Sequence, residues 1–574
     1  MERTAPSEKP EMTAFAPAER RVAAALLAVA LALRPLYAFR YRVDTDEPQH
    51  LHVAWGWAHG FVQYRDLFDN HMPLFHLLTA PLVGVLGERA DIVPLMRLAM
   101  LPCYVLTLWC TYRIGRRLFS ERVGWWAAVL AALLPPFFRC SLEFRADDLW
   151  TPLWLAALVI AVEGELTLAR VAAAGLLAGA AIGVSMKTSL LLGTLVLATV
   201  VAAAIRPRRP LRPWIGRLAA RALVFAAAAA LVPGAIAAGF AAAGAWEPFV
   251  YGTIHHNVLP SVGTWRHGPM RMMLFPAIVG ASALVGAALW RRDGEAPLGR
   301  RRLAVLLATA AYGGALAGVW PVISREDYLP FYPVLAIAVA AFTLTVGSGR
   351  GWMRAWAPAT LAVLELVVQL VAVPLWTDHA DRQTAFVDDV LRLTRPGDPV
   401  FDLKGETIFR RRASYWVFEY ITKARLDRGL IADTVPEELI ATATHVVIPD
   451  CHQLTPRTRQ FLSDHYVSVG RLRVAGARLA CAEDAPRRFE VAIPGSYRLI
   501  EKPAGATGTD DATGPPRFEV DGEDANGARL LAPGSHELRT RGCHGSVVLV
   551  WAPAVERGFS PVVDPAPEVA WRTS

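Results

Sequence analysis

Long apolar runs, several of them separated by short arginine-rich segments, dominate residues 22–376 of this 574-residue chain. A transmembrane helix needs about 20 consecutive, mostly apolar residues. The runs that approach this length are residues 22–39, 94–112, 123–138, 149–167, 171–186, 188–205, 222–244, 271–290, 303–322, 329–346 and 355–376. With 54% hydrophobic and 19% charged residues, the chain is too apolar for one soluble core. The sequence therefore predicts a mainly α membrane protein, a polytopic helical bundle of about 11 transmembrane helices.

Two segments beside the long apolar runs need separate interpretation. Residues 1–21 are polar, and the apolar run after them has no small-residue cleavage site, which predicts a cytoplasmic tail followed by a retained anchor. Residues 73–87 are apolar but short, so we expect an interfacial or re-entrant segment there. The predicted transmembrane domain is residues 22–376.

The arginines between the runs predict the orientation, because short cytoplasmic loops are enriched in Lys and Arg. With the N-terminus inside, the cytoplasmic loops hold Arg113, Arg116, Arg117 and Arg122, then Arg206, Arg208, Arg209, Arg212, Arg217 and Arg221, then Arg291, Arg292, Arg300, Arg301 and Arg302. The opposite loops, 40–93, 139–148, 245–270 and 323–328, are poorer in base and richer in acid. The net charge of +8 therefore indicates membrane topology and lipid headgroups as partners, and not nucleic acid.

Beyond residue 376 the long apolar runs stop, and the chain is predicted to be soluble and on the outer side. Residues 377–485 alternate short apolar strands, at 400–403 and 445–448, with helical stretches such as 413–430, which predicts a small α/β domain. From residue 486 to 574, short strands split by Pro and Gly turns predict a β-sandwich-like domain. Its segment 505–516 has the composition of a linker.

Metal and thiol chemistry have little support in the sequence. The six cysteines show no CxxC pair and no metal-ligand spacing. His255, His256 and Asn257 are the alternative metal ligands, but adjacent histidines lack the i, i+4 spacing that puts both on one helix face. We expect no cofactor to be required, and no motif supports a divalent cation.

Carboxylates follow the first span directly. Asp44, Asp46 and Glu47 begin the first outer loop, where a substrate at the membrane surface can reach them. The structural alternative makes Asp46 a helix N-cap and Glu47 part of the first turn. Residues 51–61 can then form one apolar face of an interfacial helix, and a polar segment follows with Tyr64, Arg65, Asp66 and His71. Such a segment suits a lipid carrier that approaches sideways.

The second outer loop repeats this acidic pattern with Glu143, Arg145, Asp147 and Asp148. An acid at the centre of a membrane helix costs about 2.5 to 3.5 kcal/mol, so acids near spans usually face a water-filled cavity or have a function. A plain loop remains the alternative, because this cost shrinks at the membrane boundary.

The order and spacing of these segments resemble the GT-C glycosyltransferases of the protein O-mannosyltransferase and lipid A aminoarabinose transferase type, including the branch that adds galacturonic acid to lipopolysaccharide. The resemblance covers roughly residues 20–345. It is carried by Asp46-Glu47, Tyr64-Arg65-Asp66 with Met72-Pro73-Leu74, Arg145-Ala146-Asp147, Lys187, and the segment from Tyr328 to Pro333. It implies an inverting enzyme of the bacterial inner membrane that transfers a sugar from a polyprenyl phosphate to an extracytoplasmic glycan, lipid or protein.

The resemblance also implies roles for individual residues. Asp46 matches the acid that activates or orients the acceptor, with Glu47 in support. Asp147 matches the second-loop acid, and Asp148 is its neighbouring alternative. His71 departs from the lysine that family members often carry at this position, and neutral His binds phosphate less well than Lys.

The expected chemistry agrees with these residue types. Displacement at an anomeric carbon needs a carboxylate for the acceptor proton or for positive charge on the sugar, and it needs cations for the departing phosphate. Lys187, Arg266 and Arg325 lie on the outer side and can bind phosphate. Snorkelling is the alternative for Lys187, and an ion pair with Glu326 or Asp327 is favoured for Arg325. The predicted substrate-binding set is Asp44, Tyr64, Arg65, Asp66, His71, Glu143, Arg145, Asp148, Lys187, Arg266, Arg325 and Tyr328.

Two other functions compete with transfer. A transporter or flippase predicts internal repeats and charges at mid-membrane depth, but no clear repeat is visible and the acids fall at span ends. A scaffold that only displays the soluble domain leaves the acidic loops without a role. Arg410, Arg411 and Arg412 in that domain are predicted to form a solvated or lipid-facing patch.

Overall fold

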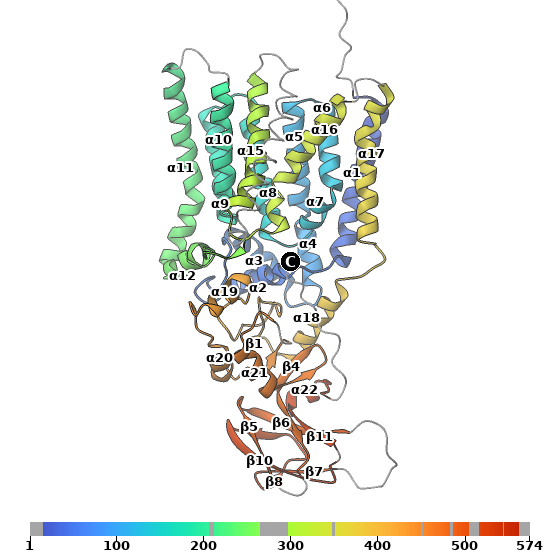
Figure 1. Ribbon diagram of the computed structural model, residues 1–574, viewed down its shortest axis with the longest axis vertical. Coiled ribbons are helices and arrows are strands. Elements are labelled where there is room, and N and C mark those ends of the chain that lie inside the picture. The colour runs from blue at the N-terminus through green and yellow to red at the C-terminus, as the bar shows by residue number, and fades with distance from the viewer. Residues whose placement is uncertain are drawn as a thin grey trace, which may run out of the picture.

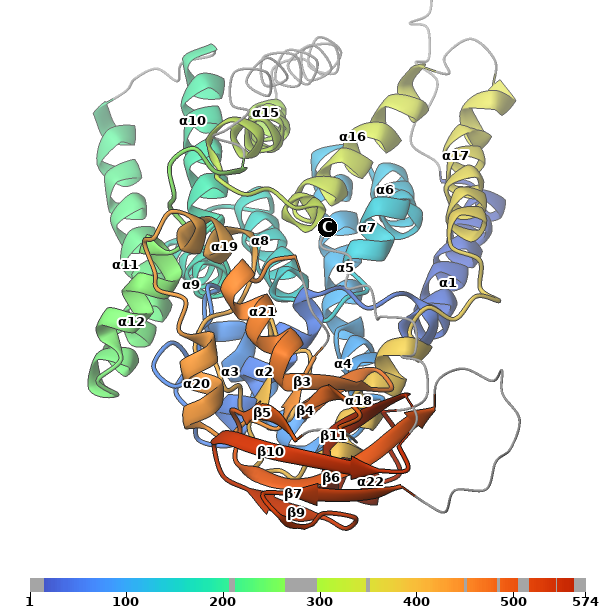
Figure 2. The ribbon, with the colours of Figure 1, turned by 60° about the horizontal axis from the view of Figure 1, so that its bottom comes forward.

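The computed structural model describes residues 15–205, 212–263, 297–346, 351–448, 452–482, 486–503, 516–543 and 545–561. A layer of long, roughly aligned helices forms one end of the molecule, and the strands form the other end (Figure 1). We refer to residues 15–372 as the helical part and to residues 377–561 as the C-terminal part. The two meet across a layer of short helices, which Figure 2 shows from below.

Helices occupy ten of the eleven predicted spans. They are α1 (Pro17–Arg40), α4 (Ile92–Ala99) with α5 (Leu101–Leu118), α6 (Glu121–Leu133), α8 (Ala146–Val162), α9 (Leu168–Val184), α10 (Thr188–Ile205), α11 (Arg212–Ala242), α15 (Pro297–Val319), α16 (Phe331–Val346) and α17 (Gly351–Ala372). The prediction for residues 271–290 lies outside the described residues.

Several of these helices have the length and composition of membrane spans. Within the described ranges, three are long and apolar enough to cross a membrane, and they are Pro17–Arg40, Ile92–Leu118 and Gly216–Ala242. Shorter apolar helices are Leu74–Leu86, Leu168–Val184, Thr188–Ala204, Phe331–Leu344 and Trp356–Ala372.

The predicted span 123–138 is divided into two helices by a proline pair. α6 ends at Leu133, and α7 (Pro135–Cys140) begins after Leu134, whose backbone is at φ −58° and ψ 113°. A proline disfavours the helical conformation of the residue before it, and it is tolerated in the first turn of the next helix. This break leads the chain into the second acidic loop.

A layer of short helices lies between the spans and the C-terminal part. It contains α2 (Asp46–Ala58), α3 (Leu74–Leu86) and α12 (Trp246–Val250), which runs into the π-helical turn η1 (Tyr251–His255). At about 1.5 Å per residue, the 13 residues of α3 are too short for a membrane core of about 30 Å. α2 is buried throughout 47–56, so the expectation of a one-sided interfacial helix at 51–61 is wrong. It is instead covered from both sides, by α3 and by the C-terminal part.

Arg113, Arg122 and Arg301 lie at the end of the helical part opposite the acidic loops. Arg122 pairs with Glu19 at 2.8 Å, and Arg113 pairs with Glu163 at 2.6 Å. Arg301 donates to a carbonyl at the end of α8 at 2.8 Å. These contacts bring the start of α1, the α5–α6 turn, the end of α8 and the start of α15 together, as the predicted topology requires.

The C-terminal part contains two sheets and several short helices. Its helices are α18 (Asp381–Leu393), α19 (Tyr420–Asp427), α20 (Val435–Ala441), α21 (Pro456–His465) and α22 (Ala552–Glu556). Its strands are β1 (Val400–Phe401), β2 (Val446–Val447), β3 (Tyr466–Val469), β4 (Leu472–Ala480), β5 (Arg487–Val491), β6 (Gly495–Pro503), β7 (Arg517–Val520), β8 (Glu523–Asp524), β9 (Arg529–Leu531), β10 (Gly534–Arg541) and β11 (Gly545–Trp551). The predicted linker at 505–516 lies almost entirely outside the described residues.

The larger sheet crosses the predicted boundary at residue 485. Its order is β1-β2-β4-β11-β6-β9, with β3 also paired to β4, and only β1 and β2 run parallel. The smaller sheet is antiparallel, in the order β5-β10-β7-β8. Because β4 pairs with β11, the two predicted C-terminal domains share one sheet, and their limits stay a prediction.

Two local predictions in the C-terminal part are wrong. The helix expected over 413–430 is confined to α19, because Glu419 accepts from the backbone N–H groups of Ile421 and Thr422 and so caps a later start. The expected arginine patch is also absent from this segment, since Arg410 and Arg412 are buried and only Arg411 is exposed. Arg410 pairs with Glu88 of the helical part at 2.9 Å.

A disulfide joins Cys481 to Cys543, with a Cα–Cα distance of 5.9 Å and a sequence separation of 62. The cysteine spacing contains no signal for this bond. It fastens the end of β4 to the segment between β10 and β11.

Replacing Cys481 and Cys543 by serine is expected to destabilise the C-terminal part by about 2–4 kcal/mol, because the bond restricts the unfolded chain. Thermal unfolding of the purified protein, followed by limited proteolysis, measures this. A reductant should reproduce the loss in the wild type and leave the double variant unchanged. Equal midpoints for both proteins would contradict the expectation.

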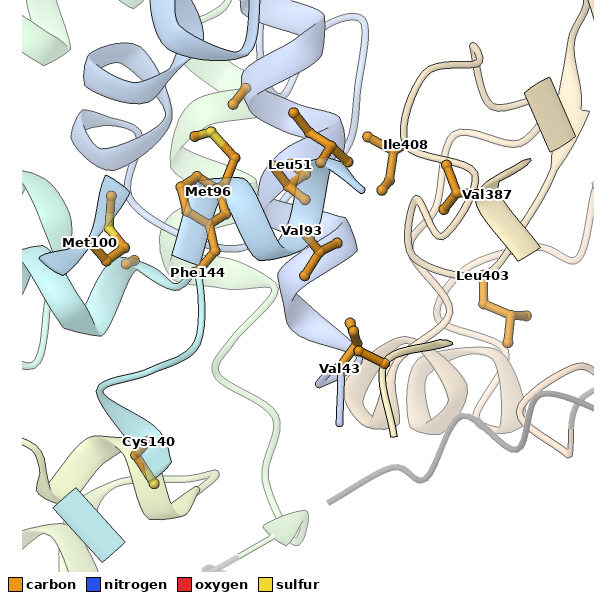
Figure 3. Close-up of a cluster of buried hydrophobic side chains, with 14 of the residues drawn as sticks. Val43, Leu51, Val93, Met96, Met100, Cys140, Phe144, Val387, Leu403 and Ile408 are labelled. Carbon is orange, nitrogen blue, oxygen red and sulfur yellow. The ribbon is translucent and has the colours of Figure 1, made fainter. Parts of the chain in front are cut away.

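Apolar packing holds the C-terminal part against the helical part. Leu51 of α2 and Val93 of α4 share one buried cluster with Val387, Leu403 and Ile408 of the C-terminal part. Figure 3 shows Leu51 and Val93 on one side of the junction and Val387, Leu403 and Ile408 on the other. Since buried apolar surface strongly opposes separation, this packing fixes the C-terminal part beside the acidic loops.

Candidate active site

Three of the predicted outer loops meet around the guanidinium of Arg145, the residue that precedes α8. Arg145 Nη1 lies 2.8 Å from Asp44 Oδ1 and 2.8 Å from Asp46 Oδ2. Its Nε is 3.7 Å from Asp147 Oδ2, and its Nη2 is 3.9 Å from Glu326 Oε2. The Arg145 side chain is only 6% exposed. One buried cation therefore brings both predicted catalytic aspartates, 46 and 147, into a single cluster.

Asp46 is the most accessible of the three acids that directly follow the first span, Asp44, Asp46 and Glu47. It is the first residue of α2, after the N-cap residue Thr45, and its side chain is 22% exposed, whereas Asp44 and Glu47 are fully buried. Its second oxygen, Oδ1, accepts from Nζ of Lys404 at 2.8 Å. Burial alone would raise the pKa of Asp46, but Lys404 and Arg145 hold it well below its ordinary value. The carboxylate is thus both ionised and reachable.

Glu47 has a different environment, because all of its contacts are internal. It accepts from Nε and Nη2 of Arg97 at 2.7 and 2.6 Å. It also accepts from the backbone N–H groups of Asp44 at 2.9 Å and Phe144 at 2.8 Å. Glu47 therefore ties both acidic loops to α4 and holds them in place.

Further acids beside Arg145 are compensated by arginine. Carboxylate oxygens of Asp44, Glu143 and Glu326 lie within 4.8 Å of one another. Arg325 Nη2 donates to Glu143 at 2.8 Å and to Asp44 at 3.3 Å, and Arg325 also pairs with Glu326, as its sequence neighbourhood favours. Burial and the surrounding acids raise the pKa of Glu143 well above its ordinary value. That no metal or other cofactor is required stays a prediction.

Lys187 supplies a second cation near Asp147. It lies in the turn between α9 and α10 and pairs with Asp327, and its side chain is 21% exposed. Burial opposes its charge, but Asp327 and Asp147 together raise its pKa. Tyr312 fixes this corner by donating to the Asp327 carbonyl at 2.8 Å.

A mostly apolar cavity adjoins this corner of the site. It lies between α8, α10 and α15 and is lined by Trp154, Leu158, Leu191, Leu195, Val305 and Tyr312, among others. Its volume of about 10 Å³ has room for about one water molecule.

The polar segment after α2 contributes one side chain near Asp46. His71 Nδ1 lies 2.9 Å from Asp69 Oδ1, and the imidazole is 30% exposed. Burial lowers the pKa of His71, but Asp69 and Asp46 outweigh this and raise it. His71 is therefore more readily charged than an ordinary histidine, which offsets part of its difference from lysine.

The other predicted residues lie around this centre or away from it. Tyr64 is buried and donates to the His71 carbonyl at 2.5 Å. Arg65 and Asp66 pair with each other at 2.9 Å near the surface. Asp148 is buried, and one of its oxygens has no hydrogen-bond partner among the described residues. Tyr328 contacts the rings of its neighbours at 331 and 332.

Two predicted sites fall outside this centre. Arg266 lies outside the described residues. His256 is buried, with Nε2 3.1 Å from Glu419 Oε1, whereas His255 is exposed. The two adjacent histidines therefore do not face one common point, as their spacing indicates.

Lys404 is the site residue that the sequence does not reveal. It follows the short strand β1 in the C-terminal part, 358 residues after Asp46. No motif connects a lone lysine to a loop so distant in sequence. The only local signal is the polar turn Asp402-Leu403-Lys404-Gly405-Glu406 after a predicted strand.

Comparison with known proteins supports the resemblance seen in the sequence. The family model described as dolichyl-phosphate-mannose-protein mannosyltransferase matches residues 70–235. The apo crystal structure of ArnT from Cupriavidus metallidurans is similar with a TM-score of 0.54 and 14% identity, over 80% of this chain and 98% of that chain. The same ArnT bound to undecaprenyl phosphate gives a TM-score of 0.50 and 14% identity, over 80% and 97%. No curated protein sequence matches the chain.

These similarities agree with the geometry described above. Identity of 14% supports the fold, and the matched family segment contains α3 and the second acidic loop. The predicted fold class is confirmed, including the C-terminal sheets. The chain is a mainly helical membrane protein with the fold of the GT-C glycosyltransferases, similar to ArnT and to the protein mannosyltransferases.

Proposed function

We propose that the protein is a glycosyltransferase that moves a sugar from a polyprenyl phosphate to an extracytoplasmic acceptor. The observation that carries the proposal is the contact of both loop aspartates, Asp46 and Asp147, with the single buried guanidinium of Arg145. Carboxylates and cations in one partly exposed site are what displacement at an anomeric carbon needs. The solved ArnT complex with undecaprenyl phosphate supports the class of donor.

In this proposal, Asp46 orients an acceptor hydroxyl toward the anomeric carbon. The new bond from the acceptor oxygen to that carbon forms as the bond from the carbon to the phosphate oxygen breaks. The electron pair leaves with the polyprenyl phosphate, and the acceptor proton passes to Asp46. A weakly basic carboxylate suffices, because the attacking oxygen becomes acidic as positive charge develops on it.

Cations near the second aspartate suit the departing phosphate. Lys187 is partly exposed beside Asp147, and His71, whose pKa is raised, lies on the Asp46 side. Each side chain is held by a carboxylate, Asp327 or Asp69, so both are in place before the donor binds.

We further propose that the site faces the outside of a bacterial inner membrane, with the C-terminal part on the same side. The arginine-rich end would then face the cytoplasm, in agreement with the positive-inside bias. The Cys481–Cys543 disulfide supports this side, because such bonds persist mainly in oxidising compartments.

The proposed reaction is tested by donor turnover. Purified protein in liposomes should consume at least one member of a panel of undecaprenyl phosphate sugars and release undecaprenyl phosphate when envelope extract is added as acceptor. Liposomes without protein are the control. Stable donors throughout the panel, with a correctly folded protein, would count against the proposal.

Cysteine labelling tests the proposed orientation. Asp381→Cys places a thiol at the exposed start of α18, and Glu121→Cys places one at the arginine-rich end. In intact spheroplasts, a membrane-impermeant maleimide should label the first variant above the wild-type background and the second only after lysis. Equal labelling of both before lysis would contradict the proposed orientation.

A further inference from the structure

Lys404 reaches the candidate active site from the C-terminal part. Its Nζ donates to Asp46 Oδ1 at 2.8 Å and to Thr45 Oγ1 at 3.3 Å. The lysine side chain is 11% exposed. Lys404 and Arg145 thus hold the two oxygens of one carboxylate from opposite parts of the chain, since Arg145 contacts Oδ2 at 2.8 Å.

The turn that presents Lys404 is held in place by hydrogen bonds and an ion pair within the C-terminal part. Asp402 accepts from the backbone N–H groups of Gly405 and Thr407 at 2.9 and 3.0 Å. Glu406 accepts from the backbone N–H of Lys404 at 2.7 Å. Arg412 pairs with Asp402 at 2.8 Å, so the central acid of the turn is itself fixed. A long lysine side chain therefore starts from a fixed backbone.

The same turn is pressed against α2, the helix that begins with Asp46. Gly405 has φ +101°, and a Cβ there would lie 2.6 Å from Cβ of His52, so only glycine fits. His52 Nδ1 in turn lies 2.9 Å from the carbonyl oxygen of Ile408. The turn and the first turns of α2 form one packed unit, joined by the apolar cluster that Figure 3 shows.

We propose that Lys404 is a positioning residue for Asp46, so that the C-terminal part completes the active site. Lys404 holds the carboxylate ionised and aimed, while Asp46 makes the contact with the acceptor. This inference rests on the proposed function. It assigns the C-terminal part a direct role in the reaction, besides any role in recognition.

The pH dependence of the reaction distinguishes this role from a purely structural one, in which Lys404 only stabilises the contact between the two parts. The charged groups that act on Asp46 are Lys404, Arg145 and His71, and Arg145 is shared with Asp44, Asp147 and Glu326. The neighbouring cations depress the pKa of Asp46, so its ionised form persists as the pH falls. Without Lys404, the pKa rises and activity is lost at a higher pH than in the wild type.

The test uses the full-length protein and compares Lys404→Met with Lys404→Arg. We expect K404M to lower kcat about 10- to 100-fold, as misplacement of a catalytic group does. Its acidic limb in kcat/KM should move up by about 1–3 pH units, the usual effect of one nearby opposite charge. K404R should restore most of both. In the Asp46→Asn background, K404M should have no further effect, because Lys404 acts through Asp46.

Glu88→Gln is the matched control, because it removes another ion pair between the same two parts, the pair with Arg410. It should leave kcat and the pH profile unchanged. Thermal midpoints of all variants identify any loss of activity that is due to misfolding, and Lys404→Gln replaces K404M if that variant is unstable.

The proposal would be overturned by a wild-type kcat in K404M, by an acidic limb that does not move, or by a change confined to a raised KM for the donor. If D46N is inactive while K404M is fully active, only this inference fails. If the wild type turns over no donor, the proposed function itself fails.

Discussion

Asp46→Asn should reduce sugar transfer about 100- to 10,000-fold, the usual contribution of a positioned acid or base. The amide keeps the shape of the side chain but cannot accept the acceptor proton, and it leaves Lys404 and Arg145 without their shared anion. Asp46 is 22% exposed, whereas its neighbours Asp44 and Glu47 are fully buried. The measurement is kcat for donor turnover by purified protein at equal folded concentration.

The control for D46N is Asp91→Asn, in the same outer loop. Asp91 is 40% exposed and pairs only with Arg89 among the ion pairs of the described residues. This variant should keep wild-type turnover. Full activity of D46N, with the control also active, would remove Asp46 from the assigned role.

Arg97→Met should have the largest effect on stability. Arg97 and Glu47 are both fully buried, and Arg97 also donates to the carbonyls of Ala38, Tyr41 and Arg42 at 2.7 to 3.1 Å. Removing one partner of a buried ion pair costs about 3–5 kcal/mol, because the other charge is left unpaired. We expect lower yield and a much lower thermal midpoint in detergent.

The matched control for R97M is Arg89→Gln, because Arg89 forms an exposed ion pair in the same loop. Its midpoint should be close to that of the wild type. The double variant with Glu47→Gln should recover part of the loss of R97M, since it also removes the unpaired charge. A wild-type midpoint for R97M would contradict the view that Glu47 and Arg97 brace the loops.

The sequence predicts the helical part well, because the signals for membrane helices lie in short stretches of neighbouring residues. A run of apolar residues must be helical inside a membrane, and arginines mark one end of the bundle. The proline pair at 135–136 also carries a local signal for the break between α6 and α7. The interfacial helix at 51–61 was wrongly expected, because burial of α2 depends on the distant C-terminal part that covers it.

The candidate site is predictable only in its outline. Asp46 and Asp147 lie at the ends of predicted spans. Because burying an acid near a membrane costs free energy, acids there indicate a function, and both residues can be picked out from the sequence. Their contact through Arg145 and the arrival of Lys404 depend on tertiary packing between loops and a sheet. For the same reason the buried partners of Arg410 and Arg412 are not predictable, since Glu88 and Asp402 become neighbours only in the fold.

The central claim is that Asp46 and Asp147 serve one active site, and a double-mutant cycle on transfer tests it most directly. The measurement is kcat for Asp46→Asn, Asp147→Asn and the double variant, each purified and folded. If the two acids act as a unit around Arg145, the double variant should be no more than about 3-fold slower than the slower single variant. A double variant whose loss equals the product of the two single losses would mean that the acids work independently, and it would contradict the account.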